Sequence, residues 1–222
     1  MADLAGLQAP HLPLMRAALA AASPRGARVA LDLACGPGGK TAWLAGLCAP
    51  GALVAGLDLD RGALAAARSA LPGFAWLAGD ALALPLRPAS AGLIWCVAAL
   101  GLFADPGRAL GEAAEALAPG GALVVATAGE RWVRRREWAP GAVEAPRAAT
   151  PPADDLGADL AEALRTAGLG QVSLAAYLLD PPGLAPRAAL LPLADLGPAA
   201  PLAVGEPEPL PVLLVAAGRA RA

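Results

Sequence analysis

Short apolar runs alternate with stretches that favour helix along the first 126 residues of the chain. Each run has the length of a buried strand and is rich in leucine, valine or alanine. The runs occupy residues 29–33, 52–57, 74–77, 93–97 and 122–126. The helical stretches occupy residues 40–47, 61–71 and 105–117, the last opening with an Asp-Pro pair suited to a cap and first turn. This alternation is typical of a doubly wound α/β fold, in which helices cover both faces of a parallel sheet.

Both ends of the chain add elements to this core. Residues 11–22 have apolar side chains at helical spacing, so a short amphipathic helix is expected before the first strand. Residues 155–166 predict another amphipathic helix, and residues 171–178 and 211–217 predict the last two strands. The proline-rich segment 180–209 between those strands is longer than a hairpin needs. It is expected either to cover a binding site or to leave the compact fold.

The stretch 29–41 carries the strongest functional signal in the chain. Its apolar strand ends near Asp32, and a turn containing Gly36, Gly38 and Gly39 follows. Glycine has no Cβ, so this backbone can adopt positive φ and lie against a ligand, while free N–H groups of the next helix face the same space. The pattern predicts a nucleotide cradle. A carboxylate at the strand end favours a positively charged ligand over a phosphate.

Three ligands compete for this loop. The glycines follow the dinucleotide pattern only in part, because Thr41 stands where the third small residue is expected. Lys40 and Thr41 match the end of a phosphate-binding Walker A loop, although Ala34 stands at its first glycine. S-adenosylmethionine has no phosphates, and its sulfonium and amino groups suit the carboxylate of Asp32. A P-loop NTPase and an S-adenosylmethionine-binding protein are therefore both open at this point.

Two further acids follow the second and third strands. Asp58 lies about 20 residues beyond the loop, where an acid can accept hydrogen bonds from both hydroxyls of an adenosine ribose. Asp80 can accept from the amino group of an adenine, while the backbone N–H that follows donates to a ring nitrogen.

The chain thus contains four motifs in a fixed order. They are Leu31-Asp32-Leu33-Ala34-Cys35-Gly36-Pro37-Gly38, Gly56-Leu57-Asp58-Leu59, Gly79-Asp80-Ala81-Leu82-Ala83-Leu84-Pro85 and Leu117-Ala118-Pro119-Gly120-Gly121. Together they resemble the class I S-adenosylmethionine-dependent methyltransferases, and most of all the small-molecule branch that includes the quinone-biosynthesis methyltransferases. The resemblance covers residues 29–126. It implies a Rossmann-like seven-stranded sheet in the order 3-2-1-4-5-7-6, with the last strand antiparallel.

The resemblance also implies a set of cofactor-binding residues. The set is Asp32, Ala34, Cys35, Gly36, Gly38, Asp58, Leu59, Asp80, Ala81 and Cys96. The residues of the first loop would line the methionine portion, Asp58 would bind the ribose hydroxyls, and Leu59 would pack on adenine. Asp80 and Ala81 would recognise the adenine edge, and Cys96 would border the pocket after the fourth strand. Ala34 replaces the family's usual glycine, and Gly92 stands where the family often has an acid.

The loop is also similar to that of the RNA cytosine-5 methyltransferases, whose fourth strand ends in a proline-cysteine pair. This chain has Trp95-Cys96-Val97-Ala98 at that place, and it is acidic overall, with a net charge of −2 and a pI near 5.4. Nucleic-acid binding needs a basic surface. We therefore expect a small-molecule acceptor and no nucleic acid.

The length and composition limit the class further. A chain of 222 residues suits one domain, with an N-terminal helical cap at 1–28, a cofactor-binding core at 29–126, and substrate-side segments with the last strands at 127–222. Although 57% of the residues are hydrophobic, glycine or proline breaks the uncharged stretches, so no membrane span is expected. The first residues lack the pattern of a secretory signal, and the three cysteines have no metal-ligand spacing, which favours the cytoplasm and no metal. The many arginines and the single lysine suggest a GC-rich bacterial gene.

The acceptor is expected to lie against segments outside the core. Residues 11–22, 129–152 and 180–209 can reach the carboxyl ends of the strands and are rich in apolar side chains, which favours an apolar or aromatic small molecule. Arginines of the second segment would lie near the mouth of the pocket. No His/Asp or paired-carboxylate arrangement defines a base, so the catalytic residue is unknown, with His11 and Tyr177 the only candidates. A cofactor-binding protein of this fold without turnover is a further alternative.

Overall fold

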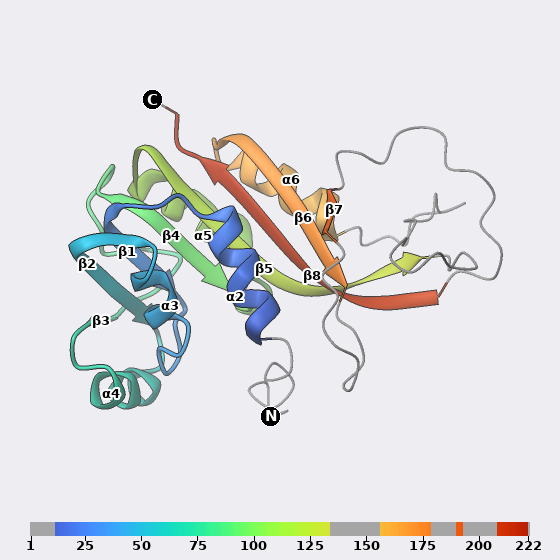
Figure 1. Ribbon diagram of the computed structural model, residues 1–222. Coiled ribbons are helices and arrows are strands. Elements are labelled where there is room, and N and C mark those ends of the chain that lie inside the picture. Colours follow the sequence, from blue (N-terminus) through green and yellow to red (C-terminus); the bar gives the residue numbers. More distant parts are fainter. Residues whose placement is uncertain (1–11, 134–155, 179–189, 193–207, 222) are drawn as a thin grey trace.

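A mixed β-sheet forms the centre of the protein (Figure 1). The computed structural model describes residues 12–133, 156–178, 190–192 and 208–221. The strands are β1 (Ala27–Leu33), β2 (Cys48–Asp58), β3 (Ala75–Ala78), β4 (Ala91–Val97), β5 (Leu117–Val133), β6 (Gly170–Leu178), β7 (Leu190–Pro192) and β8 (Glu208–Arg219). The helices are α2 (Leu12–Ala22), α3 (Thr41–Ala45), α4 (Arg61–Ala70), α5 (Pro106–Ala116) and α6 (Leu156–Thr166), with a short 3₁₀ turn, η2 (Leu100–Leu102).

The strands of the described ranges lie in the order β3-β2-β1-β4-β5-β8-β6-β7. Neighbouring strands from β3 to β5 run parallel, whereas β8 is antiparallel to both β5 and β6. Because β8 is the seventh strand predicted from the sequence, the predicted order 3-2-1-4-5-7-6 with an antiparallel last strand is confirmed. The sequence did not predict β7, which pairs antiparallel with β6 at the edge of the sheet. Residues 179–189 and 193–207 lie outside the described residues, so a cover over the site by 180–209 stays a prediction.

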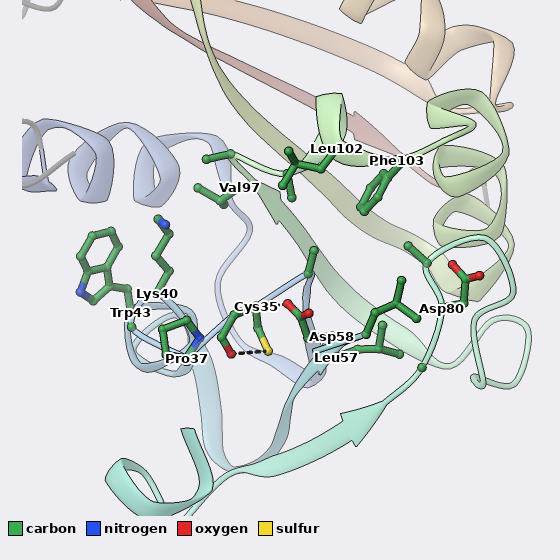
Figure 2. Close-up of a pocket in the computed structure, with 18 of the residues that line it drawn as sticks. Cys35, Pro37, Lys40, Trp43, Leu57, Asp58, Asp80, Val97, Leu102 and Phe103 are labelled. Atoms are coloured by element: carbon green, nitrogen blue, oxygen red, sulfur yellow. Dashed lines mark hydrogen bonds between the residues drawn. The ribbon is translucent and has the colours of Figure 1, made fainter. Parts of the chain in front are cut away.

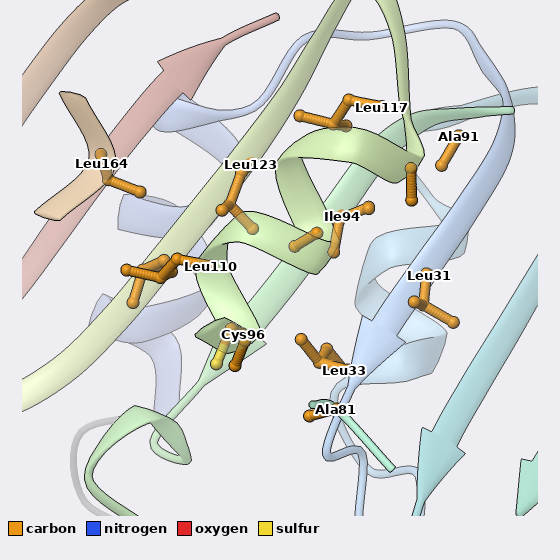
Figure 3. Close-up of a cluster of buried hydrophobic side chains, with 14 of the residues drawn as sticks. Leu31, Leu33, Ala81, Ala91, Ile94, Cys96, Leu110, Leu117, Leu123 and Leu164 are labelled. Atoms are coloured by element: carbon orange, nitrogen blue, oxygen red, sulfur yellow. The ribbon is translucent and has the colours of Figure 1, made fainter. Parts of the chain in front are cut away.

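Helices cover both faces of this sheet (Figure 1). On one face α2 and α3 pack against the strands, with Leu19 and Trp95 in one buried cluster. On the other face α5 and α6 pack through Leu110 and Leu164 against Ile94 and its neighbours (Figure 3). Successive side chains of β4 alternate between the two clusters, as the strand period requires. The long apolar runs of the sequence are therefore strands buried on both faces.

Side-chain caps fix the starts of α4 and α5. Asp105 Oδ1 accepts from the N–H of Arg108 at 2.9 Å, which confirms the cap predicted there. Asp60 Oδ1 accepts from the N–H groups of Gly62 at 2.7 Å and Ala63 at 3.1 Å. Since Asp60 lies two residues beyond the end of β2, its cap directs the chain into α4 as soon as it leaves the sheet.

Candidate functional site

The carboxyl ends of β1, β2, β3 and β4 meet at one edge of the sheet. In the parallel register Leu33 pairs with Leu57 on one side and with Cys96 on the other, and Asp58 pairs with Ala78. The loops beyond these strands surround a cavity of about 580 Å³, a size typical of small-molecule sites (Figure 2). It is lined by Leu12, Ala34, Cys35, Gly36, Pro37, Gly39, Lys40, Trp43, Leu57, Asp58, Leu59, Gly79, Asp80, Ala81, Val97, Ala98, Ala99, Leu102 and Phe103.

The loop after β1 is fixed to the end of β2. Ala34, Gly36 and Gly38 have φ values of 56°, 53° and 80°, so every second residue adopts the left-handed region. This winding brings the N–H of Cys35 to the carbonyl of Leu57 at 3.0 Å. Ala34, Cys35 and Gly36, three of the residues predicted to bind the cofactor, thereby line the cavity. Ala34 has a side chain in a region that costs an alanine about 1–2 kcal/mol, which explains why glycine is the commoner residue at such a position.

Asp58 ends β2 and faces the cavity, partly buried (Figure 2). Its Oδ2 accepts from the N–H of Gly36 at 2.7 Å, and its Oδ1 accepts from the N–H of Asp60 at 2.9 Å. These two bonds fix the carboxylate between the first loop and the start of α4. Leu59 follows at the mouth of the cavity with 70% of its surface exposed, and an exposed apolar side chain beside a cavity suits packing on a ligand.

Asp80 and Ala81 lie in the loop after β3. The N–H of Leu82 donates to Asp80 Oδ1 at 2.9 Å, and the N–H of Leu84 donates to Glu112 Oε2 of α5 at 2.9 Å, so this loop is attached to the helix behind it. Within the described ranges, neither the Ala81 N–H nor the second oxygen of Asp80 has a hydrogen-bond partner. Both are available to a ligand, which is what recognition of an adenine edge needs.

Two predicted site residues lie in the protein interior and do not line the cavity. Asp32 is 2% exposed, and its Oδ2 accepts from the hydroxyl of Thr41 at 2.6 Å. Burial raises the pKa of this carboxyl to about 6, against the opposing effects of Thr41 and Lys40. Cys96 is 1% exposed in the cluster of Figure 3, and burial raises the pKa of its thiol to about 12.

Gly38, also predicted to bind the cofactor, does not line the cavity and instead lets an aromatic side chain pack beneath the loop. A Cβ at Gly38 would overlap the indole of Trp76 on β3, lying 2.9 Å from Cζ3 and closer still to Cη2. Trp76 is buried, and its Nε1 donates to the carbonyl of Leu71 at 3.1 Å. A Cβ at Gly56 of β2 would meet the same ring at 2.5 Å. The indole therefore fills the space between the loop and the sheet.

Lys40 and Trp43 line the end of the cavity away from Asp80 (Figure 2). Lys40 is partly buried, and this burial lowers the pKa of its ammonium, although the charge of Asp32 acts in the opposite direction. Thr41 is 0% exposed and donates its hydroxyl to Asp32. In a P-loop this hydroxyl would contact a magnesium ion. The geometry therefore disfavours the Walker A interpretation.

The loop after β4 contributes cavity residues that sequence reasoning missed. Ala98 has a φ of 58°, and its N–H donates to the carbonyl of Ala126 at 2.7 Å, so the chain turns away from the sheet there. Val97 at the end of β4, and Leu102 and Phe103 beyond it, line the cavity, and Leu102 is 76% exposed. This stretch is apolar and matches no motif. The sequence marks this stretch only by its position after the fourth strand. From that position we expected Cys96 to border the pocket, but Cys96 lies one residue before the strand ends.

The expected acceptor walls are described only in part. Leu12 of α2 lines the cavity, as expected for the segment 11–22. His11 and residues 134–155 lie outside the described residues, as does the side chain of Tyr177. Across the ranges that the structure describes, no group of three His, Cys, Asp or Glu side chains is placed to hold a metal ion. No helix in those ranges has the length and apolar character needed to cross a membrane.

The part of the chain that forms the cavity is similar to known methyltransferases. A family model described as a methyltransferase domain matches residues 31–125. A trans-aconitate 2-methyltransferase of Methylobacterium nodulans is 40% identical over 95 residues, covering 43% of this chain and 36% of that protein. A 2-phytyl-1,4-naphtoquinone methyltransferase of Thermosynechococcus vestitus is 39% identical over 105 residues, covering 46% of each. The chain thus spans less than half the length of these curated relatives.

Among solved structures, a SAM-dependent methyltransferase of Thermotoga maritima, described as a possible histamine N-methyltransferase, has the same fold. The TM-score is 0.60 at 17% identity, with 99% of this chain and 96% of that chain covered. The likeness therefore extends beyond the matched motifs to the arrangement of the whole sheet.

Proposed function

We propose that this chain binds S-adenosylmethionine and transfers its methyl group to a small acceptor. Two findings support this: residues 31–125 match a family model described as a methyltransferase domain, and the fold is that of a solved SAM-dependent methyltransferase. The observation that carries the proposal is the cavity at the strand ends, where the backbone of Gly36 and the carboxylates of Asp58 and Asp80 come together (Figure 2).

The charges around this cavity suit the cofactor. S-adenosylmethionine supplies a methyl group activated on a sulfonium, and it carries two positive groups and one carboxylate. The cavity wall presents the carboxylates of Asp58 and Asp80 and the ammonium of Lys40, which favours a ligand of mixed charge with an excess of positive groups. A polyphosphate would face both carboxylates, without the hydroxyl of Thr41 to hold a magnesium ion. An NTPase is accordingly the weaker hypothesis.

The polar and loop residues of the cavity wall have roles in this proposal. Asp58 would accept from the ribose hydroxyls, and Asp80 with the N–H of Ala81 would bind the adenine edge. Leu59 would pack on the adenine ring, and the loop at 34–36 would lie along the methionine portion. These contacts hold one reactant in place, and alignment of two reactants alone can provide effective molarities of about 10⁵ to 10⁸ M. We assign no base to the reaction.

An apolar or aromatic acceptor is supported by the other side of the cavity. Leu12, Val97, Leu102 and Phe103 line it there, and pockets of this composition bind apolar small molecules. The two curated relatives are named for trans-aconitate and for a naphthoquinone, which are both small molecules. The acidic composition further argues against a nucleic-acid acceptor.

Titration calorimetry and a transfer assay test this function separately. We expect the purified chain to bind S-adenosylhomocysteine and not ATP with magnesium. Transfer of a labelled methyl group to a panel of phenols, quinols and amines then distinguishes an enzyme from a protein that only binds the cofactor. Binding of ATP that is abolished by Lys40→Ala, with no response to S-adenosylhomocysteine, would support the P-loop instead. Cofactor binding without transfer to any acceptor would leave a binding protein of the same fold.

A further inference from the structure

Lys40 is the only lysine in the chain, and its side chain lines the cavity. Within the described ranges no hydrogen bond or ion pair engages its ammonium. The carboxylate whose charge acts on Lys40, that of Asp32, is buried and accepts from Thr41 instead. Burial also lowers the pKa of Lys40, so its position has a cost that nothing in the described protein offsets with a direct contact. A partly buried cation without a partner indicates that a ligand provides one.

The position of Lys40 within the cavity defines the chemistry of that ligand. Asp58 and Asp80 occupy the middle and the far end, so the ammonium is separated from the two acids (Figure 2). Trp43 lines the cavity beside it with a mostly apolar ring (Figure 2). This end therefore suits one anionic group on a ligand whose remaining parts are apolar or positively charged. A phosphate chain fits poorly, because one lysine is the only cation among the cavity residues.

We propose that Lys40 binds a carboxylate of the ligands that this cavity holds, and so determines specificity for them. The inference rests on the proposed methyl transfer, because that function names two sources for the carboxylate. One is the amino-acid portion of the cofactor, which extends away from the adenosine held by Asp58 and Asp80. The other is a carboxylate on the acceptor itself. Both sources place the same group against the same ammonium.

Two ligands that differ only in the amino-acid portion separate these sources. S-adenosylhomocysteine carries the carboxylate, and 5′-methylthioadenosine has the same thioether and nucleoside without it. We would measure the Kd of both by calorimetry for the parent chain, Lys40→Met, Lys40→Arg and Arg28→Met. Arg28 is an exposed residue near the start of β1 that does not line the cavity, so its variant controls for the loss of a positive charge. Affinity for 5′-methylthioadenosine also reports whether each variant is folded.

If the cofactor supplies the carboxylate, Lys40→Met weakens S-adenosylhomocysteine by roughly 10- to 100-fold and leaves 5′-methylthioadenosine unchanged, as expected for a lost charge-assisted hydrogen bond. Lys40→Arg retains most of the affinity, and Arg28→Met matches the parent. If the acceptor supplies it, both affinities stay unchanged. Lys40→Met then loses the preference of the parent for acceptors with a carboxylate over the corresponding primary amides, measured as a ratio of transfer rates.

The remaining outcomes overturn the proposal. Equal weakening of both nucleosides by Lys40→Met means that Lys40 supports the loop and binds no carboxylate. If Lys40→Met leaves both affinities unchanged, the proposal is also overturned in two cases. In one, the parent shows no preference for carboxylated acceptors; in the other, Lys40→Met keeps the preference that the parent shows. A parent chain that binds neither nucleoside refutes the proposed function itself, and the Lys40 inference with it. Nucleoside binding by the parent chain therefore distinguishes a failure of the proposed function from a failure of the Lys40 inference.

Discussion

Two glycines of the same loop differ in what lies beyond their missing side chains, and alanine substitutions should reveal the difference. Gly36 and Gly38 both have positive φ, at 53° and 80°. A Cβ at Gly36 would meet nothing within 4 Å, whereas a Cβ at Gly38 would overlap the indole of Trp76. Gly36→Ala therefore measures the backbone strain, and Gly38→Ala measures similar strain together with the overlap.

The magnitudes follow from these two terms. The left-handed region costs an alanine about 1–2 kcal/mol, and the reduced freedom of the unfolded chain returns about 0.4–1 kcal/mol of that. Gly36→Ala is thus expected to destabilise the protein by about 0–1.6 kcal/mol. Overpacking of a buried site adds typically about 1–3 kcal/mol, so Gly38→Ala is expected to cost about 1–4.6 kcal/mol. For a chain of this size the added loss lowers Tm by about 2–4 °C per kcal/mol.

Urea denaturation followed by circular dichroism, without ligand, measures both variants, and a third substitution locates the overlap. Trp76→Phe removes the part of the indole that a Cβ at Gly38 would contact. In that background Gly38→Ala should lose most of its added cost, because only the strain and a 3.3 Å approach to the Cβ of Ala67 are left. Equal losses for the two glycines in the parent chain, or an undiminished loss for Gly38→Ala in the Trp76→Phe background, would refute this account of the loop.

Three further predictions concern the acids and the exposed wall. Burial raises the pKa of Asp32 from 3.8 in the unfolded chain to about 6 in the folded protein. The protonated Asp32 therefore contributes its full stability below pH 3.8, and this contribution is lost as the pH rises through about 6. Relative to Asp32→Asn, the parent should therefore lose about 3 kcal/mol of unfolding free energy between pH 3 and pH 8, and a constant difference in a pH series of denaturations would contradict this. Asp58→Ala should weaken S-adenosylhomocysteine by about 1.5–3 kcal/mol in calorimetry and, by removing the acceptor for Gly36, also lower stability by about 1 kcal/mol. Leu102→Ser, at a residue 76% exposed, should change stability by less than about 0.5 kcal/mol but reduce transfer to apolar acceptors, and unchanged transfer would remove Leu102 from the acceptor wall.

The positions of the central strands could be predicted from the sequence because these strands are buried on both faces. Their order in the sheet was instead implied by the resemblance to the class I methyltransferases. Strands buried on both faces appear as continuous apolar runs, and the glycine, proline and acidic residues between them mark where each run ends. The short strand β7 could not be predicted in the same way. Its three residues lie in a segment where proline, leucine and alanine recur without a period, so nothing separates them from their neighbours.

Predicted site residues at or just beyond the strand ends line the cavity, whereas those within the strands do not. Asp58 is the last residue of β2, and Leu59, Asp80 and Ala81 lie beyond strands, at the sheet edge where ligands bind. Asp32 belongs to β1 itself, and its side chain lies in the interior against a hydroxyl nine residues further along the chain. That contact depends on how the loop winds, which the order of its glycines leaves undetermined.

Trp76 shows why the loop could not be derived from its own motif. The glycine pattern permits the left-handed conformations at 36 and 38 but does not select them over others. At position 38 the constraint comes from β3, because Trp76 fills the space beneath the loop and leaves no room for a side chain at Gly38 or at Gly56. Arg68 of α4 donates to the carbonyl of Trp76 at 3.3 Å and so connects α4 to the same position. The cradle that faces the cavity is therefore shaped in part by a residue that does not line it, and substitutions at Trp76 should alter cofactor affinity through the loop alone.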